Sequence, residues 1–154
     1  MKARDIMTPD PFAVTVSDPV WRAAEMMRYE DIGGVPVVSD RAERRLVGLI
    51  TDRDITVRCV ARRHGATCNV VSHMTPLPLR TVHPDDDIRE IVRHMEAADV
   101  RRVPVVDENG VLIGIVAERD LVMKLAPSDA VTVHRRIKEA SRRPVAPIDA
   151  AVHP

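Results

Sequence analysis

The sequence predicts an α+β protein in which two copies of one β-α-β-β-α unit pack sheet to sheet, with pseudo-two-fold symmetry. The first observation behind this prediction is a duplication along the chain. The matching segments are GLITDRD (48–54) with GIVAERD (114–120), MTPDP (7–11) with MTPLP (74–78), and VPVV (35–38) with VPVV (103–106). The second concerns burial: one copy cannot cover both faces of its own sheet, and the sheet of a second copy can cover the exposed face.

The elements of each unit follow from its apolar pattern. One helix per copy is indicated by apolar residues three or four positions apart. These residues are Val20, Ala23, Ala24 and Met27 in the first copy and Ile88, Ile91, Val92 and Met95 in the second. Runs of β-branched and aliphatic residues predict strands at 34–38, 46–51, 102–106 and 112–117. Asn109-Gly110 predicts a tight hairpin between the last two strands. Each unit ends in a further helix.

We therefore expect two repeats, residues 1–65 and 66–126, followed by a segment of different character at 127–154. DAVTVHRRIKEASRR at 129–143 predicts a basic helix. Its stripe of Val133, Ile137 and Ala140 suits docking on the rest of the protein or on a dimer mate. PVAPIDAAVHP at 144–154 is expected to be loosely ordered.

Composition narrows the function classes. The 154 residues include 23 Lys or Arg and 23 Asp or Glu, and this balance argues against a general nucleic-acid binder. No apolar stretch is long enough for a membrane span, and the N-terminus lacks the apolar core of a signal peptide, so a cytoplasmic protein is expected. The sequence contains no P-loop, no metalloprotease motif and no nucleophile beside an obvious base, so no enzyme is predicted.

The tandem units, the MTP segments and the G-h-h-T-x-x-D segment (h, apolar) resemble the CBS domain pair, or Bateman module, from Ala3 to Leu125. YEDIGGVPVV and DVRRVPVV are similar to the stand-alone bacterial CBS proteins of the actinobacterial hypoxic-response type. The resemblance implies a non-catalytic regulatory module without an obligatory cofactor. It further implies an adenosine-containing ligand (AMP, ADP, ATP or S-adenosylmethionine) between the repeats, a homodimer and a protein partner of unknown identity. The alternative is a CBS dimer without a ligand that acts as an interaction scaffold.

Thr51 and Asp54 are the first candidate binding residues. A strand that ends at Thr51 leads into a helix start, where free N–H groups favour a phosphate, and an aspartate offers two oxygens to the ribose hydroxyls. The resemblance assigns these roles to Thr51 and Asp54. It completes the site with Thr75, Val100 as an adenine wall and Arg101 toward phosphate; Arg53 is a further phosphate candidate. The alternative is a capping box, in which Thr51 and Asp54 serve the helix alone.

The second copy has Ala117 in place of Thr51, so it lacks the hydroxyl. We expect a second, degraded site on Asp120 and Arg119, completed by Thr8, Ile32 and Gly33 of the first copy. Loss of one hydrogen bond to a charged group weakens a site by roughly ten- to a hundredfold.

Four residues invite a metal hypothesis: Cys59, His64, Cys68 and His73. Their spacing fits no compact zinc pattern and the second copy lacks them, so no metal is predicted. Cys59 is expected to be a small apolar residue on a helix face.

Overall fold

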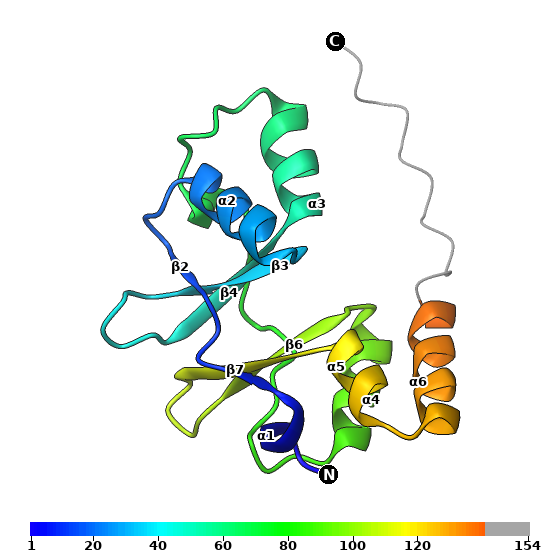
Figure 1. Ribbon diagram of the computed structural model, residues 1–154. Helices are drawn as coiled ribbons and strands as arrows, with labels where there is room; N and C mark the ends of the chain where they lie inside the picture. The colour runs from blue at the N-terminus through cyan, green and yellow to red at the C-terminus, as the bar shows by residue number, and fades with distance from the viewer. Residues whose placement is uncertain (141–154) are drawn as a thin grey trace.

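The computed structural model describes residues 1–140, which form two sheets facing each other with helices on their outer sides (Figure 1). One sheet has the strand order β2-β3-β4-β5 and the other β1-β7-β6. The strands of the first are β2 (Val14–Thr15), β3 (Gly34–Val38), β4 (Leu46–Thr51) and β5 (Thr75–Pro76). Those of the second are β1 (Thr8–Pro9), β6 (Arg102–Val106) and β7 (Leu112–Ala117).

The helices complete the predicted units. They are α1 (Ala3–Ile6), α2 (Val20–Glu30), α3 (Asp52–Asp54), α4 (Ile88–Ala98), α5 (Glu118–Lys124) and α6 (Pro127–Ala140). α3 continues as a π-helical turn (Ile55–Cys59) and a 3₁₀ turn (Val60–Arg62), and another 3₁₀ turn covers Val70–Ser72. The tandem fold is thus confirmed. The first strand of repeat 2 is reduced to a parallel bridge between Val82 and Val105.

The ends of the two repeats are exchanged. β1, from the start of the chain, pairs antiparallel with β7 of repeat 2, and β5 pairs antiparallel with β4 of repeat 1. Ala3 and Ile6 belong to the hydrophobic core of repeat 2, while Val70 belongs to that of repeat 1. The packing units therefore differ from the sequence units divided at residue 65, because each short terminal segment finds its partner strand in the other repeat.

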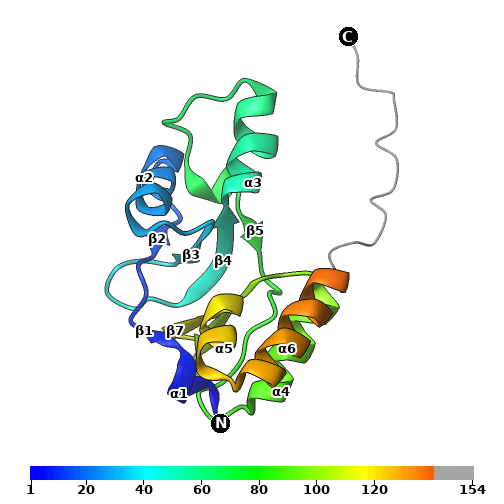
Figure 2. The same ribbon diagram turned by 45° about the vertical axis from the view of Figure 1, so that its right-hand side comes forward.

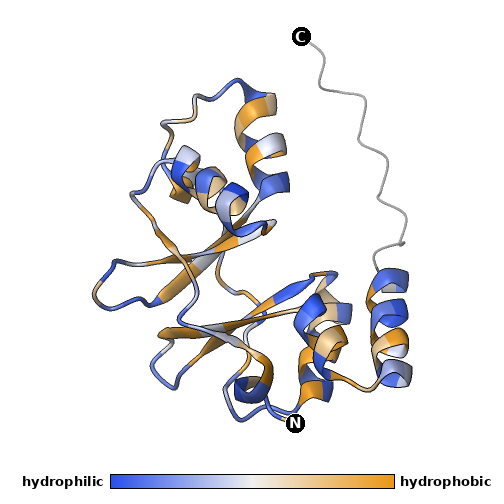
Figure 3. Ribbon diagram, viewed as in Figure 1, coloured by the Kyte–Doolittle hydropathy of each residue, from blue (hydrophilic) through white to orange (hydrophobic). Residues whose placement is uncertain are grey.

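The apolar faces of the helices lie against the sheets, and Figure 3 shows apolar residues concentrated along the strands. Val20, Ala23 and Met27 of α2 are buried, as are Ile91, Val92 and Met95 of α4. Two predicted face residues differ: Ile88 is half-buried and Ala24 is exposed. The face of α2 that packs on the core is formed by Val20, Ala23 and Met27, and Ala24 lies at the edge of this face.

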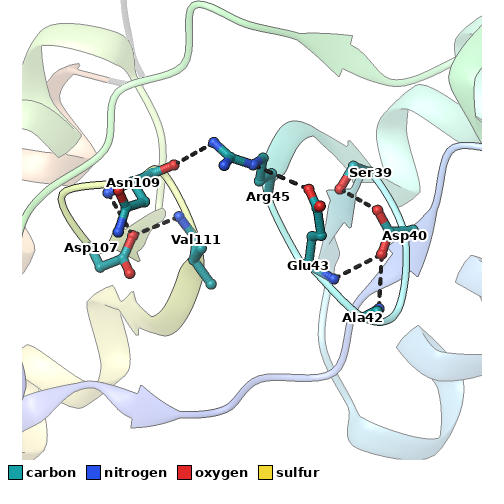
Figure 4. A network of polar contacts seen from close by, with 8 residues as sticks. All are labelled: Ser39, Asp40, Ala42, Glu43, Arg45, Asp107, Asn109 and Val111. Carbon is teal, nitrogen blue, oxygen red and sulfur yellow. Dashed lines mark hydrogen bonds and ion pairs between the residues drawn. The ribbon is translucent and has the colours of Figure 1, made fainter.

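The two β-hairpins hold the sheets against each other. Val38, Leu46, Val106 and Leu112 form a separate buried cluster. Leu46 N–H donates to the Gly110 carbonyl and Leu112 N–H to the Arg44 carbonyl, both at 3.0 Å. In the same region the Arg45 guanidinium donates to the Asn109 carbonyl at 3.0 Å (Figure 4). Asn109-Gly110 forms the predicted turn, with Gly110 at φ 76°.

The C-terminal helix packs on repeat 2. α6 lies beside α4 and α5 (Figure 2), and Ile137 is 1% exposed within the repeat 2 core. The Arg136 guanidinium pairs with Glu96 of α4 at 2.6 Å. Docking of this stripe on the protein itself is confirmed for Val133 and Ile137. The end of the predicted helix (141–143) and the tail at 144–154 lie outside the described residues.

Within residues 1–140, none of the helices has the length and apolar character that crossing a membrane requires.

Candidate ligand clefts between the repeats

Each repeat uses the same backbone device to bring its last strand against the segment after its first helix. α2 and α4 are followed by the capping residues Asp31 and Asp99, whose φ angles of 50° and 52° place them in the left-handed region. Asp and Asn adopt this conformation more readily than most residues, so the helix stops and the chain turns. At the next helix start, Asp52 N–H donates to the Gly33 carbonyl at 3.1 Å, and in repeat 2 Glu118 N–H donates to the Arg101 carbonyl at 2.9 Å.

The glycine at the head of each repeated segment allows another segment to approach. A Cβ added to Gly48 would lie 2.7 Å from both Met74 Sδ and the Thr75 carbonyl oxygen. A Cβ on Gly114 would collide with the side chain of Met7. Each exchanged MTP segment thus packs directly over the glycine of the strand that it joins. This contact explains why Gly and Met recur together in both copies.

The first cleft, which we call the Thr51 cleft, lies where the end of β4 faces the segment before β6. Its volume is about 310 Å³. Thr51, Arg53, Val100 and Arg101 line it, so four of the six residues predicted for this site come together. Arg101 also pairs with Glu118, at 3.8 Å.

Asp54 and Thr75 are not among the residues that line the Thr51 cleft. Thr51 donates to Asp54 Oδ2 from both its N–H and its hydroxyl, at 2.9 Å each, and Thr51 Oγ1 accepts from Asp54 N–H at 3.1 Å. The capping-box alternative is therefore confirmed as local geometry. Arg58 Nε lies 3.5 Å from Asp54 Oδ1 and holds the other oxygen. Thr75 pairs with Leu49 on the neighbouring strand.

The second cleft, the Asp120 cleft, has a volume of about 230 Å³. Thr8, Ile32, Arg119 and Asp120 line it, as predicted. Gly33 instead lines the Thr51 cleft, since its carbonyl is drawn toward Asp52.

The Asp120 cleft is lined both by apolar side chains and by the carboxylate of Asp120. Pro36 and Ile115 contribute apolar surface beside Ile32. Asp120 Oδ2 accepts from Ala117 N–H at 2.8 Å, and Ala117 has no hydroxyl to add. The Asp120 carboxylate thus lines the cleft with fewer internal bonds than Asp54 has.

Arg102 lines both clefts and was not among the residues predicted for either site. Burial lowers the pKa of its guanidinium, as does Arg119, while Asp52 and Asp120 act in the opposite direction. Arginine nonetheless stays protonated near neutral pH, so the group is a half-buried cation between two cavities. The sequence carried one signal for Arg102: the two repeats differ at this position, where repeat 1 has Gly34. Gly34 also lines both clefts.

Known proteins share this architecture. The CBS domain family matches residues 3–60 and 70–127, so the chain belongs to the CBS domain family, as a tandem pair. Hypoxic response protein 1 of Mycobacterium tuberculosis is 35% identical over 129 residues, which cover 84% of this chain and 87% of that protein. The resemblance to the hypoxic-response type is thereby confirmed. An uncharacterized protein of Methanopyrus kandleri, MK0525, is 31% identical, and the chain covers 65% of its length.

Solved structures give the same family and fold. A crystal structure of Hypoxic Response Protein I, with two coordinated zinc ions, has a TM-score of 0.74 at 35% identity, over 82% of this chain and 100% of that one. The CBS pair of MJ0100, in complex with 5'-methylthioadenosine and S-adenosylmethionine, has a TM-score of 0.70 at 25% identity, over 80% and 94%. CBSX2 in complex with AMP has a TM-score of 0.68 at 26% identity, over 79% and 94%.

Proposed function

We propose that this CBS pair is a non-catalytic regulatory module that binds an adenosine-containing ligand between its repeats. The observation that carries the proposal is the pair of clefts, each lined from both repeats and both sharing the cation of Arg102. A half-buried guanidinium is a strong partner for a phosphate or carboxylate. The AMP and S-adenosylmethionine complexes of CBSX2 and MJ0100 support this class of ligand.

In the Thr51 cleft we assign the phosphate to Thr51, Arg53 and Arg101, and adenine to the apolar wall at Val100. Arg102 adds a second guanidinium to the phosphate end. The ribose requires Asp54, which in the free protein is engaged by Thr51 and Arg58. Binding of a ribose there would exchange these internal bonds for bonds to the 2'- and 3'-hydroxyls. We propose that this exchange transmits ligand binding to the helix that follows α3.

In the Asp120 cleft the carboxylate already lines the cavity, next to the apolar side chains of Ile32 and Ile115. These groups suit a ribose and an adenine ring. Thr8, Arg102 and Arg119 could bind a phosphate in this cleft, but position 117 offers no hydroxyl to it. We therefore propose that this cleft takes the adenosine part of a ligand and holds a phosphate less firmly than the Thr51 cleft does.

We further propose a homodimer whose geometry changes on ligand binding and is read by a protein partner. Exposed apolar side chains on helical segments of repeat 1 support an additional interface. They are Trp21 (42% exposed) and Tyr29 (70%) on α2 and Val57 (49%) and Val60 (62%) in the turns after α3. Light scattering of the purified chain, with and without ligand, tests this part.

The main experiment is a calorimetric titration of AMP, ADP, ATP and S-adenosylmethionine into wild type, Asp54→Ala and Asp120→Ala. The proposal expects saturable binding of at least one of these ligands in wild type. Asp54→Ala should remove the tighter, phosphate-dependent event, and Asp120→Ala should leave that event within about threefold of wild type. Absence of binding at millimolar ligand would refute the proposal and favour the scaffold alternative, in which Thr51 and Asp54 only cap the helix.

A further inference from the structure

The segment that joins the two repeats brings together three side chains that ligate metals. His64 and Cys68 lie in the loop after the Val60–Arg62 turn, and His73 directly follows the Val70–Ser72 turn. One ligand atom from each of these residues lies within 4.8 Å of the other two. The imidazole centroids of His64 and His73 are 5.2 Å apart. The sequence named these residues among four metal candidates, but their spacing fitted no compact zinc pattern, because the loop folds back on itself to bring them together.

The backbone of this loop is fixed on α2, which gives the cluster a defined position. The Cys68 carbonyl accepts from Val20 N–H at 2.8 Å, and the Ala66 carbonyl accepts from Trp21 N–H at 3.0 Å. The loop thus satisfies free donors at the start of α2. Cys68 is half-buried and packs against the repeat 1 core. The positions of the ligands consequently depend on packed structure.

The side chain of His73 is buried, and one of its ring nitrogens has no hydrogen-bond partner among the described residues. The residue is 2% exposed, and its Nε2 atom is buried without a hydrogen bond to any of the described residues. A buried polar atom without a partner costs about 1–3 kcal/mol, so such atoms are rare and need an explanation. A metal ion bound at Nε2 would provide the missing interaction.

The donor set and its exposure both suit a zinc-like ion. Two imidazoles and one thiolate are common zinc ligands, and three protein ligands with a solvent position form an open tetrahedral site. Tetrahedral Zn–N and Zn–S bonds place ligand atoms roughly 3.3–3.8 Å apart, so side-chain rotations that bring these atoms closer by at most about 1.5 Å would complete the site. His64 is exposed, which leaves the ion a path from solution and room for a water ligand.

A second thiol lies beside the cluster but is held differently. Cys59 is 1% exposed and belongs to the repeat 1 core, as predicted for a small apolar residue. Its Sγ donates to the His64 carbonyl at 3.7 Å and to the Gly65 carbonyl at 3.8 Å. We therefore treat Cys59 as a buried core residue outside the ligand set and Cys68 as the thiolate ligand.

We propose that His64, Cys68 and His73 form a binding site for Zn²⁺ or a similar divalent transition-metal ion. The ion would clamp the loop between the repeats onto the core of repeat 1. The sequence-based expectation of no metal rested on spacing, and the proposal replaces it because the fold brings the ligands together. It is independent of ligand binding in the two clefts.

The test uses the full chain without an affinity tag, stripped with a chelator and kept reduced. Zn²⁺ is titrated in competition with a chromophoric chelator, and Co²⁺ is added separately to observe thiolate-to-cobalt charge transfer and tetrahedral d–d bands. The variants are Cys68→Ser and His64→Asn. The matched controls are Cys59→Ala, the neighbouring thiol, and His83→Asn, an exposed histidine of repeat 2.

The proposal expects one Zn²⁺ per chain, a cobalt charge-transfer band and a higher melting temperature with Zn²⁺. Cys68→Ser should abolish the band and weaken Zn²⁺ binding by on the order of a hundredfold, and His64→Asn should weaken it by at least about tenfold. Both controls should retain wild-type affinity within about threefold. Zn²⁺ binding that persists in Cys68→Ser, or a cobalt band that disappears only in Cys59→Ala, would overturn the assignment. So would an absence of stoichiometric binding in wild type.

Discussion

The hydroxyl of Thr51 donates to the carboxylate of Asp54 at 2.9 Å and accepts from its backbone N–H at 3.1 Å. In repeat 2 the corresponding aspartate, Asp120, accepts one hydrogen bond, from the N–H of Ala117 at 2.8 Å, and pairs with Arg119 at 3.9 Å. One strand-to-helix junction is thus closed by reciprocal hydrogen bonds, and its copy is closed by a single one. This difference arises from one side chain and has consequences for both stability and binding.

We expect Thr51→Ala to lower the free energy of unfolding by about 1 kcal/mol, the usual loss when an N-cap hydroxyl is removed. The reverse change, Ala117→Thr, should raise it by a similar amount, because it gives Asp120 N–H an acceptor. Urea denaturation of both variants against wild type measures these effects. A stability gain from Thr51→Ala, or a large loss from Ala117→Thr, would contradict the argument.

Arg102 should affect both clefts, since it lines each of them. We expect Arg102→Gln to weaken nucleotide binding by about tenfold in each cleft through loss of a charge-assisted hydrogen bond. Arg93→Gln is the control, because Arg93 lies on α4, pairs with Glu90 at 3.0 Å and lines neither cleft. Calorimetry with AMP measures the effect, and a loss confined to one cleft would show that Arg102 serves only that one.

The glycines that the repeats share should be intolerant of a methyl group. Gly48→Ala and Gly114→Ala should each cost about 1–3 kcal/mol, because the added Cβ meets Met74 or Met7 and the exchanged strand must shift. Gly65→Ala is the control, since the nearest atom to its added Cβ is 3.8 Å away. Thermal and urea unfolding compare the variants. Equal stabilities of all three would contradict close packing at these strands.

The two cysteines should differ in reactivity. Burial raises the pKa of the Cys59 thiol, and neighbouring Cys68 raises it further, so Cys59 stays protonated at pH 8 and is a poor nucleophile. Cys68 is half-buried and more accessible to a reagent. In the metal-free protein, alkylation with iodoacetamide followed by peptide mass spectrometry should therefore modify Cys68 first. Faster modification of Cys59 would contradict the burial of its thiol.

The local pattern of the chain was sufficient for most elements. The four main strands and the helices at 20–30 and 88–98 agree with the apolar periodicity and the β-branched runs that predicted them. The helix after β4 was less regular than expected, since α3 passes into π-helical and 3₁₀ turns. Apolar spacing indicates a helix but does not determine which backbone hydrogen bonds close its turns.

The sequence by itself determined the duplication, the fold and the candidate residues Thr51 and Asp120, because repeats and periodicity are local properties of a chain. Only the tertiary structure showed that β1 and β5 change places and that Arg102 lies between both clefts. It also decided between the two alternatives stated for Asp54, which bonds to Thr51, and showed that His64, Cys68 and His73, which the sequence only named as candidates, lie close together. Each of these relationships depends on where a segment packs after a turn. Packing joins residues that are distant in sequence, and residue spacing does not specify it.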